Sequence, residues 1–244
     1  RPLPHPHATT RVRYRVTLRG GNPADALVAS QSQKVESTGP ETAEVTVDAV
    51  RPGRPGQEPE APDPPSPDDL ASNSMIQSDD QAIVAMARQI VGQQEDPWAK
   101  AVALERGVHR LVRRKGFSQA FSTAAEVAKT REGDCTEHAV LLAALTRAVG
   151  LPARVAVGLV YTDEPPAFAF HMWTQVHIDG HWIPLDATLG RGGIGAAHIE
   201  LAHTDLKDAA GFQCFLPVVH VLGRMTIDVI DVVHAPPGHD AAAE

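Results

Sequence analysis

The sequence predicts an α+β protein in which a block of helices precedes a set of antiparallel strands. Apolar residues recur at helical spacing from about residue 80 to residue 149. From residue 153 onward the chain shows short β-type segments, and Asp179-Gly180 is a strong signal for a two-residue hairpin turn. Because helices and strands are segregated along the chain, the sequence favours the α+β class.

Residues 1–51 are predicted to form a separate segment of β-strands with a hairpin. Residues 11–18 alternate strictly, and their apolar face consists of Val12, Tyr14, Val16 and Leu18. Residues 44–50 alternate in the same way, after a turn signal at Gly39-Pro40. Because an isolated pair of strands is marginally stable, we expect it to dock on the domain that follows or on another part of the protein.

Residues 52–69 are predicted to be a linker. Proline recurs throughout this segment, where it removes backbone donors and favours an extended chain. We therefore divide the chain into the N-terminal segment 1–51, this linker, a main domain over residues 70–234 and a disordered tail over residues 235–244.

Three helices are expected at the start of the main domain. The first covers about residues 80–92. The second begins at Asp96-Pro97, where the aspartate caps the helix and the proline takes its first position. The third begins at the capping box Thr123-Ala124-Ala125-Glu126 and ends at Gly133.

A fourth helix begins near Cys135 and is stopped by Gly150 and Pro152. Apolar residues occupy most of its surface: Val140, Leu141, Leu142, Ala144, Leu145 and Val149. A helix that is apolar on nearly every side is buried, so we expect this helix to be central.

The strands of the main domain follow this helix. The segments that we interpret as strands are Ala153–Tyr161, Ala169–Ile178, His181–Leu185, Phe212–Val221 and Met225–Val233. Residues Gly190–Gly195 are interpreted as a loop.

Cys135 is the residue that points most directly to a function. A thiol in the first turn of a helix lies at the positive end of the helix dipole, which favours the nucleophilic thiolate. His171, in one predicted strand, and Asp186, at the end of another, follow in chain order. These three residue types are the components of an activated-nucleophile site.

Four motifs resemble the transglutaminase-like superfamily in order and spacing: Gly133–Ala139, Ala148–Arg154, His171–Val176 and Gly180–Thr188. The chain is similar to this family over about residues 70–190, and most of all to its bacterial members with a Gly-Asp-Cys motif. The resemblance implies a papain-like core, in which a helix with a cysteine at its N-terminus packs on an antiparallel sheet.

The same resemblance implies roles for three residues. Cys135 would be the nucleophile, His171 the general base and acid, and Asp186 the residue that orients the imidazole. Asp186-Ala187-Thr188 stands where many relatives have Asp-Pro-Thr, a change that affects the local turn. The backbone N–H of Cys135 has no intrahelical acceptor at a helix start, so it is a candidate donor to an oxyanion.

The tryptophans and the other histidines do not require a catalytic role. Trp173 and Trp182 are expected to pack in the sheet, and Trp173 is also a candidate substrate-binding residue that lines the cleft. The 12 histidines form no tight Cys/His ligand set and no His-Glu-x-x-His motif. We therefore expect neither a metal nor a cofactor.

Composition limits the partners. The 22 basic and 30 acidic residues give a net charge of −8, which does not favour nucleic acid or an anionic membrane. No segment approaches the roughly 20 apolar residues of a membrane span. Cys135 and Cys214 do not make a disulfide framework, and Cys214 is interpreted as a free core residue. A bridge between them is an alternative that would remove the nucleophile.

Two hypotheses follow for the function. The first is cysteine-dependent acyl transfer on peptide or protein amides through a thioester, with hydrolysis favoured over crosslinking. The second is a non-catalytic interaction or scaffolding module that keeps the fold. In the second hypothesis the N-terminal strands and the linker belong to a larger protein of the periplasm or cell envelope. The sequence does not predict the oligomeric state.

Overall fold

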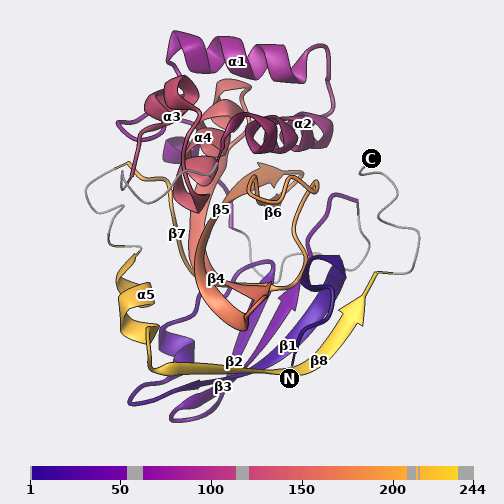
Figure 1. Cartoon of the computed structure of the whole chain (residues 1–244), viewed down its shortest axis with the longest axis vertical. Helices are drawn as coiled ribbons and strands as arrows, with labels where there is room; N and C mark the ends of the chain where they lie inside the picture. The colour runs from indigo at the N-terminus through magenta and orange to yellow at the C-terminus, as the bar shows by residue number, and fades with distance from the viewer. Residues whose placement is uncertain (1, 54–62, 114–120, 208–212, 214, 236–244) are drawn as a thin grey trace.

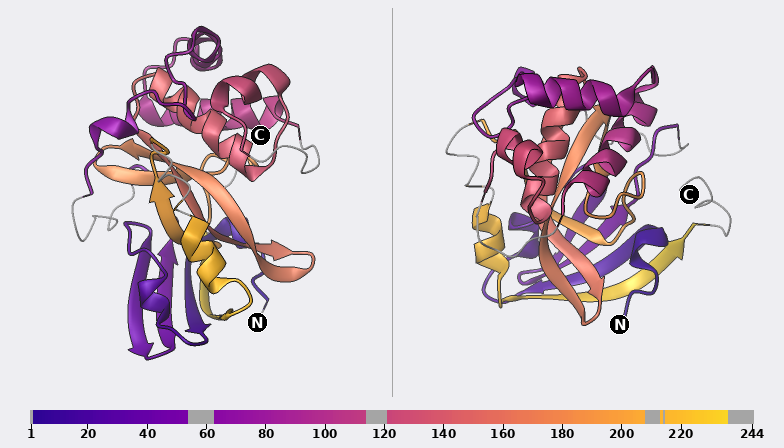
Figure 2. Two further views of the ribbon diagram at one scale, coloured as in Figure 1. Left: turned by 90° about the vertical axis from the view of Figure 1, so that its left-hand side faces the viewer. Right: turned by 45° about the horizontal axis from the view of Figure 1, so that its top comes forward.

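The computed structural model describes residues 2–53, 63–113, 121–207, 213 and 215–235. Two four-stranded antiparallel sheets and a group of helices form three layers (Figure 1). Helices α1 to α4 cover one face of the sheet ordered β6-β5-β4-β7, and the sheet ordered β2-β3-β1-β8 lies on the other side (Figures 1 and 2). The predicted α+β class is confirmed.

The helical layer consists of α1 (Gln81–Val91), α2 (Pro97–Leu111), α3 (Ala124–Thr130) and α4 (Cys135–Ala148). Helices α2 and α3 begin after the capping residues that the sequence predicts, Asp96 and Thr123, and the Asp96 side chain accepts a hydrogen bond from Ala99 N. Helix α3 ends before Gly133, because Arg131 takes the left-handed conformation with a φ of 58°. Helix α4 contacts α1, α2, α3 and β5, so the central position predicted for it is confirmed.

The sheet beneath α4 consists of β4 (Ala153–Asp163), β5 (Pro166–Ile178), β6 (His181–Leu185) and β7 (His198–Thr204). Asp179 and Gly180 have φ values of 50° and 82°, the positive angles that a type I′ hairpin turn requires. Strand β7 was not predicted, because its polar residues His198 and Glu200 face the interior, where each has a side-chain partner.

The second sheet consists of β1 (Thr9–Leu18), β2 (Gln33–Gly39), β3 (Thr42–Asp48) and β8 (Met225–His234). The alternating face of β1 is buried, as its pattern predicts. Strand β8 pairs with β1 along its whole length, so the last strand of the chain completes the N-terminal sheet. The division into segments at residues 52–69 stays a prediction.

One predicted strand is wrong over most of its length. Residues Leu216–Val221, expected to be extended, form the short helix α5. Pro217 has no N–H for a strand ladder but fits the first turn of a helix. Val218 and Val221, three residues apart, point inward, and Val219 between them is 67% exposed. Cys214 lies outside the described residues, as do 54–62 of the linker and 236–244 of the tail.

Buried hydrogen bonds join the N-terminal sheet to β7 and to the loop that precedes it. The Tyr14 hydroxyl donates to Ala196 O at 2.7 Å. Gln33 and Glu200 pair reciprocally, because the Gln33 side chain donates to Glu200 O and accepts from Glu200 N, each at 2.8 Å. The N-terminal strands therefore dock on the main domain, the first of the two options that the sequence left open. Among the described residues, no helix is long and apolar enough to cross a membrane.

Replacing Tyr14 by phenylalanine should lower the free energy of unfolding by about 1–3 kcal/mol, because the Ala196 carbonyl would stay buried without this donor. Urea unfolding measures the change. Arg11→Ala, which removes an exposed ion pair with Asp48, is the control and should cost less than about 1 kcal/mol. Equal losses in the two variants would contradict a specific role of the hydroxyl in docking.

Candidate active site

The Gly133-Asp134-Cys135 motif builds the start of α4. The Asp134 side chain accepts a hydrogen bond from Thr136 N at 2.8 Å, and Glu137 accepts one from Asp134 N at 3.0 Å. This reciprocal capping box leaves no room for a side chain at residue 133, where a Cβ would clash with the Cβ of Glu137. The motif therefore holds Cys135 at the first position of the helix, with its thiol free and partly exposed.

The packing of α4 on β5 explains why Cys135 lies near His171. The Thr174 hydroxyl of β5 donates to Ala139 O of α4 at 3.0 Å. Further along, Arg147 of α4 donates to Ala153 O, and Ala153 is the cross-strand partner of Val176, so α4 and β5 run in the same direction. Cys135 lies about 6 Å back along the helix from Ala139, and His171 about 10 Å back along the strand from Thr174.

His171 lies between the other two predicted residues. Its Nε2 donates to Asp186 Oδ2 at 2.7 Å, and its side chain also hydrogen-bonds with Cys135. Since Nε2 is engaged by Asp186, Nδ1 is the ring nitrogen left for the sulfur. Burial alone would lower the pKa of His171, but the hydrogen bonds and negative charges of Asp186 and Cys135 outweigh it and raise the pKa to about 10. The geometry thus places a protonated imidazole between the Cys135 sulfur and the Asp186 carboxylate.

Asp186 is a buried carboxylate that hydrogen bonds from two histidines and from Thr188 hold as an anion. Its Oδ1 accepts from the backbone and hydroxyl of Thr188 at 2.9 and 2.6 Å, and its Oδ2 faces both His171 and His198. Burial would raise the pKa of Asp186, yet the hydrogen bonds with the two histidines lower it well below its usual value. Asp186 therefore stays ionised and fixes the orientation of the His171 ring.

His198 of β7 is a member of the site that the sequence analysis did not identify. Its Nε2 lies 3.3 Å from Asp186 Oδ2, and its side chain is 1% exposed. Burial lowers the pKa of His198, so the neutral ring with Nε2 protonated fits this contact. The ring of His7, in the short helix η1 (Pro6–Ala8), lies 6.3 Å from that of His198. The N-terminal segment therefore reaches the candidate site.

Glu105 of α2 supports the backbone around Asp186. This fully buried carboxylate accepts hydrogen bonds from the N–H groups of Asp186, Gly192 and Gly193. Burial raises the pKa of Glu105 to about 7, although the three backbone donors oppose that rise. A glutamate four residues after Ala101 stands on the apolar face of its helix, and this anomaly is the signal by which the sequence could have identified it.

Trp173 is packed beside the candidate site. Its indole is 2% exposed, forms a small apolar cluster with Ala156 and Ile194, and stacks on the ring of His171. This burial favours the packing role, and substrate binding by Trp173 stays a prediction. Trp182 also packs in the sheet, under the guanidinium of Arg154 at 4.0 Å.

In the part of the chain that the structure describes, His171, Asp186 and His198 are also close enough together to hold a metal ion. One ligand atom of each lies within 4.8 Å of the others. The 2.7 and 3.3 Å contacts account for the same atoms as hydrogen-bond donors and acceptors. A metal on Nε2 would displace the proton that His171 shares with Asp186, so this cluster serves nucleophile activation better than metal binding.

Residues 84–187 match the family model of the transglutaminase-like superfamily. This segment runs from α1 to the residue after Asp186 and contains Cys135 and His171. Asp186 also lies within the match, so the match includes all three residues of the candidate site. No curated protein matches the chain significantly.

Solved structures with the same fold are remote in sequence. A candidate cysteine protease from Cytophaga hutchinsonii is 17% identical, with a TM-score of 0.53, and the alignment covers 93% of this chain and 84% of that one. The periplasmic domain of TgpA from Pseudomonas aeruginosa, bound to ethylmercury, is 15% identical with a TM-score of 0.43, over 75% of this chain and 91% of its own. The first similarity supports the papain-like arrangement of helix and sheet, and the predicted fold is thereby confirmed.

Replacing His198 by leucine should destabilise the protein by about 1.5–3 kcal/mol, because the buried Asp186 carboxylate would lose one charge-assisted hydrogen bond. His198→Gln keeps an N–H near the Nε2 position and should recover a large part of this loss. Urea unfolding of both variants measures the difference. Equal destabilisation by leucine and glutamine would mean that ring packing, and not the donor, is what His198 supplies.

A matched control is His203→Leu on the same strand, which removes a half-exposed partner of Glu200 and leaves Asp186 untouched. Its loss should be smaller than that of His198→Leu.

The raised pKa of His171 predicts a pH dependence of stability. Its contribution should be fully present below the unfolded value of 6.5 and should be lost as pH rises through about 10. The free energy of unfolding should therefore fall between about pH 8.5 and pH 10. At lower pH, the proton that a folded-state Cys135 thiolate has lost relative to the unfolded thiol would offset the proton that His171 keeps. His171→Gln should flatten this slope, measured by urea unfolding at several pH values.

Other shifted groups act outside this window. Glu105, with a pKa raised to about 7, loses its contribution as pH rises from about 4.5 to 7, and His7 and His198, whose pKa values are lowered, change stability only below pH 6.5. An unchanged slope in His171→Gln would contradict the ion pair.

Proposed function

We propose, from the premise that residues 84–187 form a transglutaminase-like core, that this protein is a cysteine-dependent acyl-transfer enzyme. Its substrates would be peptide or protein amides, and a thioester on Cys135 would be the intermediate. The observation that carries the proposal is the contact of His171 with both Cys135 and Asp186. Nucleophile, proton shuttle and orienting carboxylate then follow one another within hydrogen-bond reach.

The first half-reaction uses the thiolate–imidazolium pair. The Cys135 sulfur attacks the amide carbon, and the carbonyl oxygen gains the negative charge. The N–H of Cys135, at the start of α4, is the candidate donor to this oxyanion. His171 gives its proton to the leaving amine, the C–N bond breaks, and an acyl thioester stays on Cys135.

The second half-reaction reverses the proton transfer. His171, now neutral, takes a proton from water or from an amine as that group attacks the thioester, and the Cys135 thiolate leaves. Asp186 holds the ring in place and stabilises its charged form throughout. We propose hydrolysis as the main outcome, because none of the described residues near Cys135 forms a dedicated amine site.

The state of Cys135 supports catalysis more than a scaffolding role. A scaffold that keeps only the fold needs neither a free thiol nor an ionised partner for it. Cys135 is free and partly exposed, and His171 beside it has a raised pKa. These properties are typical of reactive cysteines, not of structural ones.

Iodoacetamide should alkylate Cys135 at pH 6 at least about 10-fold faster than it alkylates a free thiol of ordinary pKa near 8.5, because the imidazolium stabilises the thiolate. His171→Ala should slow this reaction to the free-thiol rate. Mass spectrometry identifies the labelled residue, and Cys135→Ser is the blank. No acceleration at pH 6, together with no effect of His171→Ala, would refute the activated thiolate.

Acyl transfer itself is tested with p-nitrophenyl acetate as donor. A transient acetyl group on Cys135, absent in Cys135→Ser, is the expected result. An alkylation-competent Cys135 that never becomes acetylated would refute the acyl-transfer proposal.

A further inference from the structure

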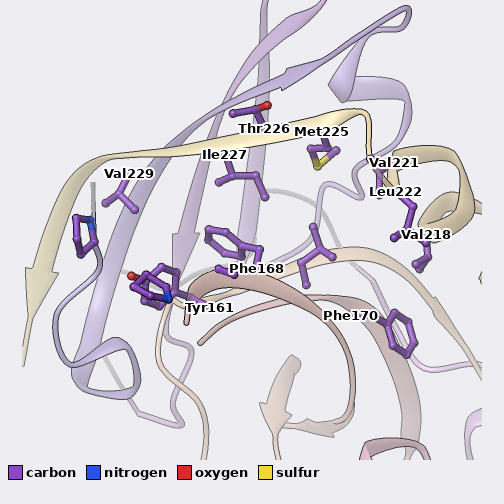
Figure 3. Close-up of a pocket in the computed structure, with 15 residues that line it drawn as sticks. Tyr161, Phe168, Phe170, Val218, Val221, Leu222, Met225, Thr226, Ile227 and Val229 are labelled. Atoms are coloured by element: carbon purple, nitrogen blue, oxygen red, sulfur yellow. The ribbon is translucent and has the colours of Figure 1, made fainter. Parts of the chain in front are cut away.

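An apolar cavity of about 520 Å³ lies between β8, the β4–β5 hairpin and α5 (Figure 3). Among the described residues, no charged side chain lines it, and the polar side chains of its lining are the hydroxyls of Tyr161 and Thr226. Figure 3 shows Ile227 and Met225 on one side, Phe168 facing them, and Phe170 toward one end. A cavity of this size and character is within the range of ligand-binding sites.

Strand β5 connects one end of this cavity to the candidate site, because the lining residue Phe170 directly precedes His171, which hydrogen-bonds with Cys135. Phe168 and Phe170 alternate with Ala169 and therefore share a strand face with Thr174, the residue that hydrogen-bonds to α4. Phe170 lies about 13 Å back along the strand from Thr174. Cys135 lies about 6 Å back along the helix from Ala139, the residue to which Thr174 donates. Phe170 therefore lies beyond the Cys135 end of α4 along the strand.

Aromatic contacts make the path from Cys135 to the cavity continuous. Ser122 N donates to Glu137, in the first turn of α4, at 3.0 Å, which ties residue 121 to the helix start. The rings of Phe121 and Phe215 are 4.9 Å apart, and those of Phe215 and Phe170 are 5.9 Å apart. A row of aromatic rings thus extends from the segment that Ser122 joins to the first turn of α4 to Phe170 at the cavity.

We propose that this cavity binds a large aliphatic or aromatic side chain of a polypeptide substrate, on the acyl side of the reacting amide. The inference rests on the proposed function, and the absence of charge in the lining is what selects an apolar side chain. The acyl part is the fitting occupant, because it stays on Cys135 through both half-reactions while the amine departs.

Exposed apolar residues around the cavity favour a polypeptide over a small molecule. Leu216 and Val219 of α5 and the following residue Leu222 are 58%, 67% and 66% exposed, and Phe170 is 39% exposed. These residues extend the apolar surface well past the cavity itself, as the flanking residues of a polypeptide require.

Two affinity labels test the proposal without a known substrate: the chloromethyl ketones of N-acetyl-leucine and N-acetyl-glycine. In each, the Cys135 thiolate displaces chloride and forms a C–S bond. The leucine label should react at least about 10-fold faster than the glycine label, because burial of an aliphatic side chain contributes about 1–3 kcal/mol. Iodoacetamide, which has no such side chain, reports the intrinsic reactivity of Cys135.

Two variants act on the cavity by different means. Ile227→Trp fills it from β8, and Leu222→Asp puts a charge on its exposed rim. In each variant the leucine label should react at most about 2-fold faster than the glycine label, well below the factor expected for a buried aliphatic group. The rate of the iodoacetamide reaction should stay unchanged. Val233→Trp, at an exposed position of β8 outside the lining, should keep the preference.

The outcomes separate this inference from the proposed function. Equal rates for the two labels in the unmodified protein, with a His171-dependent iodoacetamide reaction, would overturn the apolar site and leave the acyl-transfer proposal standing. A leucine preference that persists in both cavity variants would also overturn it. An iodoacetamide rate that does not depend on His171 would instead refute the proposed function.

Discussion

The buried carboxylate of Asp186 is the constraint on which the candidate site depends. An ionised carboxylate that is 1% exposed is stable only if surrounding donors replace the water it has lost. The donors come from His171 on β5, His198 on β7 and the turn at Thr188, while Glu105 on α2 holds the backbone. Satisfying one charge therefore fixes the relative positions of two strands, a turn and a helix, and with them the ring that faces Cys135.

Parts of the chain outside the family match contribute to this arrangement. The match ends at residue 187, and His198 follows it on β7. The N-terminal sheet holds the start of β7 through Tyr14 and Ala196, and η1 brings His7 near His198. Strand β8 and helix α5 form walls of the apolar cavity. In this protein the segment that matches the transglutaminase-like family model carries the candidate triad, and the flanking segments contact the site and line the cavity near it.

The sequence predicted elements whose boundaries are set by local caps and turns. It did not predict elements whose buried polar residues are paired with residues far away in the sequence. The caps at Asp96 and Thr123 and the turn at Asp179-Gly180 predicted element boundaries closely, because each residue acts on its own backbone. Strand β7 was missed because its polar residues are paired with other strands. Helix α5 was read as a strand because β-branched residues dominate it, although Pro217 fits a helix start better.

The sequence by itself determined the α+β class, the cap that places Cys135 at the start of a buried helix, and the order of Cys135, His171 and Asp186. Only the tertiary structure decided how these three meet, that His198 and Glu105 complete their surroundings, and where the N-terminal strands dock. The physical reason is the range of the interactions. Capping, turns and periodicity act within a few residues, whereas burial and charge compensation depend on which distant segments pack together.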